Sequence, residues 1–274
     1  MTNRFGKIVD KTFLSVDNAE TRGFIHRDYI AHCLRWSHVI KYLSKGQLFK
    51  NARILDVGCG RETPLAKMLY SSKMAPDYYL GIDAGKINDF NFGKYNDRFE
   101  FFEQEDFATM SDLNEVDNFD VITCFEVLEH VEPLHAGKIL RRIRTQLSED
   151  GYAFISTPCF NGKAAGNHVN EMTYEAFYNL LGQTGFDVSR HWGTFASITD
   201  YKHLMSSQAR SVFDMMRDYF DVNVLSCLFA PLYPNASRNV LWKVAKDVSI
   251  EFRDWDTIKK PWSSSEKWED LKNA

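Results

Sequence analysis

The chain has 274 residues, 44% of them apolar and 26% charged, with a formal net charge of -4 at pH 7. This composition suits one large globular core, and without a long basic run it argues against nucleic acid as the main partner, although a local basic patch stays open. The five scattered cysteines contain no C-x-x-C pair, which predicts reduced thiols in a cytoplasmic protein. No apolar run reaches the roughly 20 residues that cross a bilayer, so we expect no membrane partner.

Apolar residues recur with a helical period over residues 22–45, and Gly46 is a stop signal for that helix. Strands and helices then alternate along the chain. We predict strands over 52–57, 78–83, 99–103, 119–124, 152–157, 186–192 and 239–246, and helices over 62–72, 133–147, 173–183 and 200–220. This alternation predicts an α/β fold with a mainly parallel sheet and helices on both faces.

Three segments follow from this pattern. Residues 1–48 are expected to form an N-terminal arm and helical cap, and residues 49–247 a core with a helical insertion at about 197–238. Residues 248–274 are a charged tail that contains three tryptophans. The oligomeric state does not follow from the sequence.

The run Ile54-Leu55-Asp56-Val57-Gly58-Cys59-Gly60 indicates a buried strand that ends in a turn poor in side chains. Thr63 is a candidate N-cap of the next helix, and Pro64 its first residue. Such a turn places bare backbone N–H groups at the carboxyl edge of a parallel sheet, where open α/β sheets bind ligands. Thr63 stands where a dinucleotide fingerprint requires glycine, and a P-loop is missing, which leaves S-adenosylmethionine (SAM) as the ligand.

Two acids follow the turn in the order that SAM requires. Asp83 ends the strand after the helix, where an acid accepts hydrogen bonds from ribose hydroxyls. Asp106 follows the third strand and would accept from the adenine amino group while Phe107 packs near the ring. These two acids and Asp56, which precedes the turn, also have local alternatives: Asp56 as a cap of the turn, Asp83 as a solvated strand end and Asp106 as a turn residue.

In this order the segments resemble the class I SAM-dependent methyltransferases; they are Ile54–Gly60, Gly81–Asp83, Gln104–Phe107, Phe119–His130 and Gly151–Pro158. The resemblance implies a Rossmann-like, seven-stranded sheet with an antiparallel last strand. It also implies a cofactor site of Asp56, Gly58, Cys59, Gly60, Asp83, Ala84, Asp106, Phe107 and Phe125. Glu62 replaces a third glycine of many members, and we expect it to begin the helix rather than to bind the cofactor ammonium.

A second motif follows the fourth strand. If the segment 125–131 is helical, Glu126, Glu129 and His130 share one face. Together with His168, in the loop after the fifth strand, they are candidate ligands of Mg²⁺ or Mn²⁺. The Glu-x-x-Glu-His segment resembles that of ubiquinone-pathway O-methyltransferases, and with the loop histidine it resembles the metal set of small-RNA 3′-end 2′-O-methyltransferases. In both, the resemblance implies a metal that lowers the pKa of substrate hydroxyls.

Two alternatives to the metal stay open. The segment can simply shape the cofactor pocket, or His130 or His168 can act as a general base, with Glu126 also a catalytic candidate. The remaining histidines are expected on the surface or on helices, except His26, which the resemblance places near the roof of the active site.

These features predict a SAM-dependent methyltransferase that acts on a small-molecule acceptor, at oxygen. The second hypothesis is the same chemistry on an RNA end or nucleotide, and the third is a non-catalytic partner protein with a SAM-binding fold. Residues 1–48 and 194–238, both rich in aromatic side chains, are the segments expected to choose the acceptor.

Overall fold

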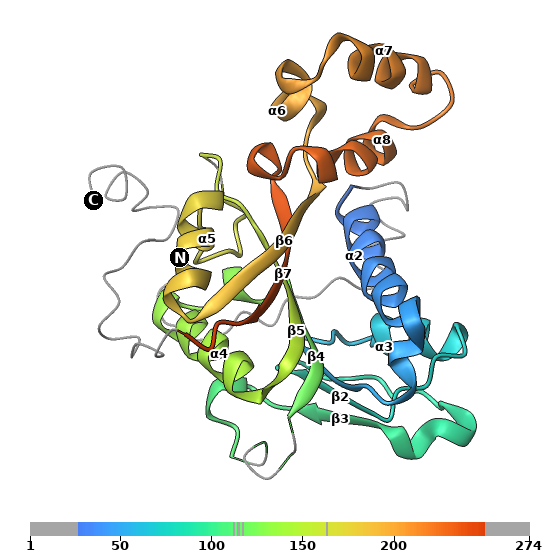
Figure 1. Ribbon diagram of the computed structural model, residues 1–274, viewed down its shortest axis with the longest axis vertical. Helices are drawn as coiled ribbons and strands as arrows, with labels where there is room; N and C mark the ends of the chain where they lie inside the picture. The colour runs from blue at the N-terminus through green and yellow to red at the C-terminus, as the bar shows by residue number, and fades with distance from the viewer. Residues whose placement is uncertain (1–26, 112, 114–115, 117, 163, 250–274) are drawn as a thin grey trace.

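A seven-stranded sheet forms the centre of the computed structural model, which describes residues 27–249 without 112, 114–115, 117 and 163 (Figure 1). The predicted arm, with His26, and most of the predicted tail lie outside these residues. The strands are β1 (Arg53–Val57), β2 (Tyr78–Asp83), β3 (Phe99–Glu103), β4 (Phe119–Phe125), β5 (Leu147–Pro158), β6 (Phe186–Phe195) and β7 (Asn239–Lys246). The predicted strands agree with these bounds, except that β5 and β6 are longer.

The strand order is β3-β2-β1-β4-β5-β7-β6, and only the pairings of β7 are antiparallel. The predicted mainly parallel sheet with an antiparallel last strand is therefore confirmed. In β1, Ile54, Leu55 and Val57 are all buried, because helices cover both faces of the sheet. The carboxyl ends of β1, β2, β4 and β5 consequently meet at one edge.

Four helices form the two outer layers (Figure 1). They are α2 (Arg27–Ser44), α3 (Pro64–Ser71), α4 (Pro133–Gln146) and α5 (Tyr174–Gln183). Two separate clusters of buried side chains show the faces: α2 and α3 pack on one side of the sheet, and α4 and α5 on the other. Helices on both faces were predicted and are confirmed. Among the described residues, no helix combines the length and apolar character needed to cross a membrane.

Three short helices lie between β6 and β7, where the insertion is expected: α6 (Ile198–Tyr201), α7 (Ser207–Met216) and α8 (Val222–Phe229). Figure 1 shows α6 and α7 beyond the end of β6, with α8 between them and the sheet. They enclose a small core of their own that includes Tyr201, Phe213 and Leu225. The predicted helix over 200–220 is thus divided between α6 and α7, and α8 was not predicted.

The glycine turn after β1 has the backbone conformation that its glycines permit. Gly58 and Gly60 have φ values of +73° and +74°, and the N–H groups of Gly58 and Cys59 donate to the Ile82 carbonyl at 2.8 and 3.1 Å. Pro64 begins α3 as predicted. Thr63 occupies the N-cap position as predicted, with φ +44°, but its side chain makes no capping hydrogen bond. The left-handed backbone at Thr63 does not present the hydroxyl to the first turn.

Asp56 ties β1 to both neighbouring strands. Its buried carboxylate accepts hydrogen bonds from the hydroxyls of Tyr79 on β2 and Thr123 on β4, at 2.5 and 2.6 Å. Burial raises the pKa of Asp56 to about 6, and these two hydrogen bonds oppose the rise. Asp56 therefore supports the turn through the sheet rather than by capping it.

The segment that follows β4 is not α-helical, so the condition for a shared face of the motif is not met. β4 continues to Phe125, Glu126 has φ +56°, and a single 3-10 turn spans Leu128–His130. The Glu126 N–H donates to the Ser156 carbonyl of β5 at 3.0 Å, which extends the sheet contact by one residue. This contact and the left-handed backbone prevent a continuous helix, so the shared helix face of Glu126, Glu129 and His130 does not exist.

We expect Gly58→Ala to destabilise the fold by about 1–3 kcal/mol, because an added Cβ would lie 2.3 Å from Val127 Cγ2 at a positive φ. Gly182→Ala is the matched control: it lies within α5 and its added Cβ meets no atom within 4 Å. Urea denaturation of both variants measures the difference. Equal free energies of unfolding for Gly58→Ala and the wild type would show that Val127 yields without cost.

Candidate active site

A cavity of about 540 Å³ opens at the carboxyl edge of the sheet. The glycine turn, the end of β2 and the segment after β4 form one part of its wall, and α2 and the first residues of β7 form another. All the predicted cofactor residues except Asp106 line this cavity. The four predicted metal ligands also line it: Glu126, Glu129, His130 and His168. Residues far apart in the sequence thus meet in one space.

Asp83 holds the glycine turn against β2. Its two carboxylate oxygens accept from the Gly60 N–H at 2.9 Å and the Gly85 N–H at 2.7 Å. Burial raises the pKa of Asp83, and the two backbone hydrogen bonds oppose this. The carboxylate still forms part of the cavity wall. Because each carboxylate oxygen has two lone pairs, capacity remains for donors from a ligand.

The structure does not place Asp106 in the cavity wall, although its neighbours Glu105 and Phe107 line it. The Asp106 carboxylate accepts from the Ala108 N–H at 3.0 Å and lies 3.2 Å from His135 Nε2. It therefore caps the short 3-10 helix Phe107–Thr109, as the turn-residue alternative expects. Its predicted contact with adenine stays a prediction.

Glu62 also lies outside the cavity wall. Its carboxylate accepts from the Asn88 side-chain amide at 2.6 Å and lies 3.2 Å from the Lys67 ammonium. Glu62 precedes the N-cap Thr63, so it does not begin the helix as expected; α3 starts at Pro64. The expected lack of contact between Glu62 and the cofactor ammonium stays a prediction.

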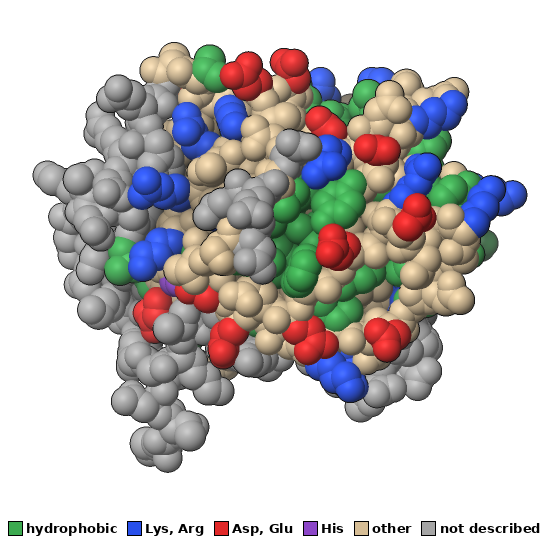
Figure 2. Space-filling model, turned by 90° about the horizontal axis from the view of Figure 1, so that it is seen from below, with side chains coloured by type: hydrophobic (Ala, Val, Ile, Leu, Met, Phe, Trp, Pro, Cys, Tyr) green, Lys and Arg blue, Asp and Glu red, His purple; other side chains and the backbone are tan. Residues whose placement is uncertain are grey.

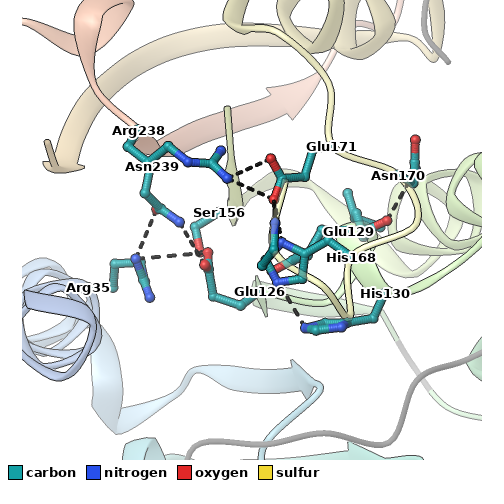
Figure 3. Close-up of polar contacts among 12 residues, drawn as sticks. Arg35, Glu126, Glu129, His130, Ser156, His168, Asn170, Glu171, Arg238 and Asn239 are labelled. Carbon is teal, nitrogen blue, oxygen red and sulfur yellow. Dashed lines mark hydrogen bonds and ion pairs between the residues drawn. The ribbon is translucent and has the colours of Figure 1, made fainter. Parts of the chain in front are cut away.

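Glu126 is the centre of a buried polar network (Figure 3). It accepts from Ser156 Oγ at 2.8 Å and Asn239 Nδ2 at 2.6 Å, and it lies 3.8 Å from Arg35 Nη1. Arg35, 1% exposed, donates in turn to Asn239 and Thr194. Burial opposes ionisation, but the Arg35 charge and these hydrogen bonds lower the pKa of Glu126 to about 2. Glu126 is therefore an ionised carboxylate that the protein itself satisfies.

Glu129 has the opposite environment. It is 1% exposed, and among the described residues neither carboxylate oxygen has a hydrogen-bond partner. Burial, followed by the nearby Glu126 charge, raises the pKa of Glu129 well above its ordinary value. A buried carboxyl group without a partner is costly and marks a position where a proton or a cation is needed.

Two imidazoles stand beside this carboxyl group. His130 Nε2 lies 3.8 Å from Glu129 Oε1, and the ring centroids of His130 and His168 are 4.8 Å apart at 89°. One ligand atom from each of the three residues lies within 4.8 Å of the other two. Within the described ranges, Glu126 is not part of this group, since it faces Arg35 and Asn239. The structure thus brings together three of the four predicted metal ligands.

Sequence reasoning missed several residues of the site. His32 and Arg35 lie on α2, in the segment that was expected to cap the core and choose the acceptor, but neither residue was singled out as a site residue. Arg238 immediately precedes β7, and Asn239 is its first residue. Burial and the Arg35 charge lower the pKa of His32 to about 3, so this imidazole is neutral. The available signal was the spacing of Asp28, His32 and Arg35, which places polar groups on one face of α2.

Comparisons with known proteins agree with this geometry. A family model described as a methyltransferase domain matches residues 26–207. A ubiquinone biosynthesis O-methyltransferase from Glaesserella parasuis is 31% identical over 107 residues, 38% of this chain and 44% of that protein. One from Aeromonas salmonicida is 35% identical over 123 residues, 43% of this chain and 48% of that protein. The chain thus matches less than half the length of these curated relatives.

Among solved structures, a SAM-dependent methyltransferase from Archaeoglobus fulgidus has a TM-score of 0.50 and 17% sequence identity. The match covers 84% of this chain and 98% of that one, and at this identity it shows the fold alone. The family model covers more than half of the chain, and the order of the strands is the one that the sequence resemblance implies. The chain therefore belongs to the class I SAM-dependent methyltransferases.

Proposed function

We propose that this chain transfers the methyl group of SAM to an oxygen atom of a small molecule. The observation that carries the proposal is one cavity that joins the glycine turn and Asp83 to Glu129, His130 and His168. Both curated relatives are named as O-methyltransferases of ubiquinone biosynthesis, which supports oxygen as the acceptor atom. On the face seen in Figure 2, acidic and basic side chains are interspersed around hydrophobic ones, unlike a uniformly basic surface for nucleic acid.

The cofactor end of the cavity fits SAM. At Gly60 an added Cβ would meet only Pro64 Cδ, at 3.9 Å, so the backbone there is open to close approach. The Asp83 carboxylate is suited to accept from ribose hydroxyls. SAM supplies an electrophilic methyl group on a sulfonium. The protein contributes alignment of the acceptor with that methyl group and exclusion of water.

The other end of the cavity fits the activation of a hydroxyl group. An oxygen nucleophile has to lose its proton, and Glu129, His130 and His168 supply one carboxylate and two imidazoles. One oxygen and two nitrogen ligands fit a divalent cation such as Mn²⁺, which accepts imidazole more readily than Mg²⁺ does. A cation there supplies Lewis acidity that lowers the pKa of the acceptor hydroxyl. It also provides the partner that the Glu129 carboxylate lacks among the described residues.

We expect Asp83→Asn to weaken SAM binding by about tenfold or more, because charge-assisted hydrogen bonds to the ribose are lost. Isothermal titration calorimetry measures this affinity. Asp77→Asn, at an exposed residue just before β2, is the control and should bind SAM like the wild type. Unchanged affinity in Asp83→Asn would remove Asp83 from the cofactor site, and no SAM binding by the wild type would favour a non-catalytic protein.

We expect Glu129→Gln to weaken Mn²⁺ binding by more than about 100-fold. Mutation of a residue that only supports a metal ligand lowers metal affinity by up to roughly 100-fold, and loss of a ligand itself should cost more. Affinity for SAM should stay within about twofold, because Glu129 is not one of the cofactor residues. Calorimetry measures both affinities, and transfer of labelled methyl groups from SAM to a panel of phenols and alcohols measures activity.

The control for this experiment is Glu132→Gln, the same change three residues later, which should leave Mn²⁺ binding intact. If metal-free wild-type protein transfers methyl groups at an undiminished rate in the presence of a chelator, the proposed role of the cation is wrong. The proton would then have to pass to an imidazole, which is the metal-free alternative.

A further inference from the structure

Glu171 is a buried carboxylate that faces the back of His168 (Figure 3). It is 1% exposed and comes from the loop between β5 and α5. Its Oε1 lies 2.5 Å from His168 Nδ1 and accepts from the Ala165 N–H at 3.1 Å. Arg238 Nη2 donates to both of its oxygens, at 2.8 and 2.6 Å. The sequence motif contained no role for this residue.

The chemistry of Glu171 determines which nitrogen of His168 carries the proton. A carboxylate that is paired with a guanidinium is ionised, and an ionised carboxylate can only accept hydrogen bonds. His168 Nδ1 must therefore donate, and it carries the proton. In the neutral imidazole this leaves the lone pair on Nε2, across the ring from Glu171.

Glu171 is itself held by the rigid edge of the sheet. Arg238 immediately precedes β7; its carbonyl accepts from the Cys159 N–H at 2.7 Å, and its Nη1 donates to the Cys159 carbonyl. The position of the guanidinium is thus set by the ends of β5 and β7. From there it orients Glu171, and Glu171 orients His168.

The same loop is attached to the residues that His168 faces. The N–H groups of Val169 and Asn170 donate to the Glu129 carbonyl at 2.9 and 3.2 Å, and Asn170 Nδ2 donates to the Leu128 carbonyl at 3.1 Å. These contacts hold the backbone of the loop against the 3-10 turn. They leave the rotation and tautomer of the His168 ring to Glu171.

We propose that Glu171, anchored by Arg238, is the positioning residue that keeps His168 in the Nδ1–H tautomer, with the Nε2 lone pair available to the Glu129 and His130 group. The effect of this tautomer on activity rests on the proposed function, since there a lone pair on Nε2 is needed to bind a cation or to accept a proton. The tautomer itself can be measured without either. A carboxylate that fixes a histidine in this way also increases its strength as a ligand.

The first experiment is nitrogen-15 NMR of the histidine side chains in the full chain, without added metal, at a pH where His168 is neutral. In the wild type, His168 should show a protonated Nδ1 and an unprotonated Nε2. In Glu171→Gln the side-chain amide can donate as well as accept, so we expect the Nε2–H tautomer or a mixture. Glu175→Gln, an exposed glutamate in the first turn of α5, is the matched control and should resemble the wild type.

The second experiment is calorimetric titration of the same proteins with Mn²⁺. We expect Glu171→Gln to bind Mn²⁺ about tenfold or more weakly than the wild type and Glu175→Gln, with unchanged affinity for SAM. A merely structural role for Glu171 would lower the melting temperature without changing the tautomer or separating the two affinities.

The results separate this inference from the proposed function. A protonated Nε2 in the wild type would overturn the inference, whether or not Glu171→Gln folds, and so would an unchanged tautomer in that variant. If the tautomers are as expected but the wild type does not bind Mn²⁺, the positioning role is supported and the proposed cation is rejected. If the wild type and Glu171→Gln bind Mn²⁺ equally well, Glu171 does not increase the strength of His168 as a ligand, and that part of the inference is rejected.

Discussion

The partly buried ion pair between Arg35 and Glu126 is the interaction on which the site depends. Arg35 belongs to α2, and Glu126 follows β4 with a left-handed backbone. An unpaired charge at such depth costs several kcal/mol, so α2 must lie across the carboxyl edge of the sheet for the fold to be stable. Asn239 and Thr194 complete the network and connect it to β7 and β6. The pairing of Arg35 with Glu126 therefore fixes α2 as one wall of the cavity.

The two glutamates of the Glu-x-x-Glu-His segment consequently have different chemistry. Glu126 is satisfied by the protein and keeps a low pKa, whereas Glu129 has a raised pKa and, among the described residues, no hydrogen-bond partner. The charge of the first carboxylate contributes to the raised pKa of the second. The four predicted ligands, three from this motif and His168 from the loop after β5, thus correspond to one structural carboxylate and a group of three residues.

Most of the fold was predictable because it depends on local patterns. The strands alternate with helices, and buried apolar runs such as Ile54–Val57 locate them within a few residues. The sequence left open whether the segment 125–131 is helical, since helical spacing of its side chains says nothing about the hydrogen bond from the Glu126 N–H to β5. The helix α8 was missed because its sequence is apolar and is followed closely by Pro231 and Pro234, which favour a loop. Packing on α6 and α7 stabilises it instead.

By itself, the sequence determined the glycine turn, the acid at the end of β2 and the order of elements that brings them to one edge. These features depend on neighbouring residues and on backbone angles that glycine adopts most readily. Only the tertiary structure decided which polar groups are already paired. Asn239 is 113 residues from Glu126, and Arg238 is 67 residues from Glu171. No local pattern encodes such contacts, because they form only when β7 inserts beside β5 and completes the sheet.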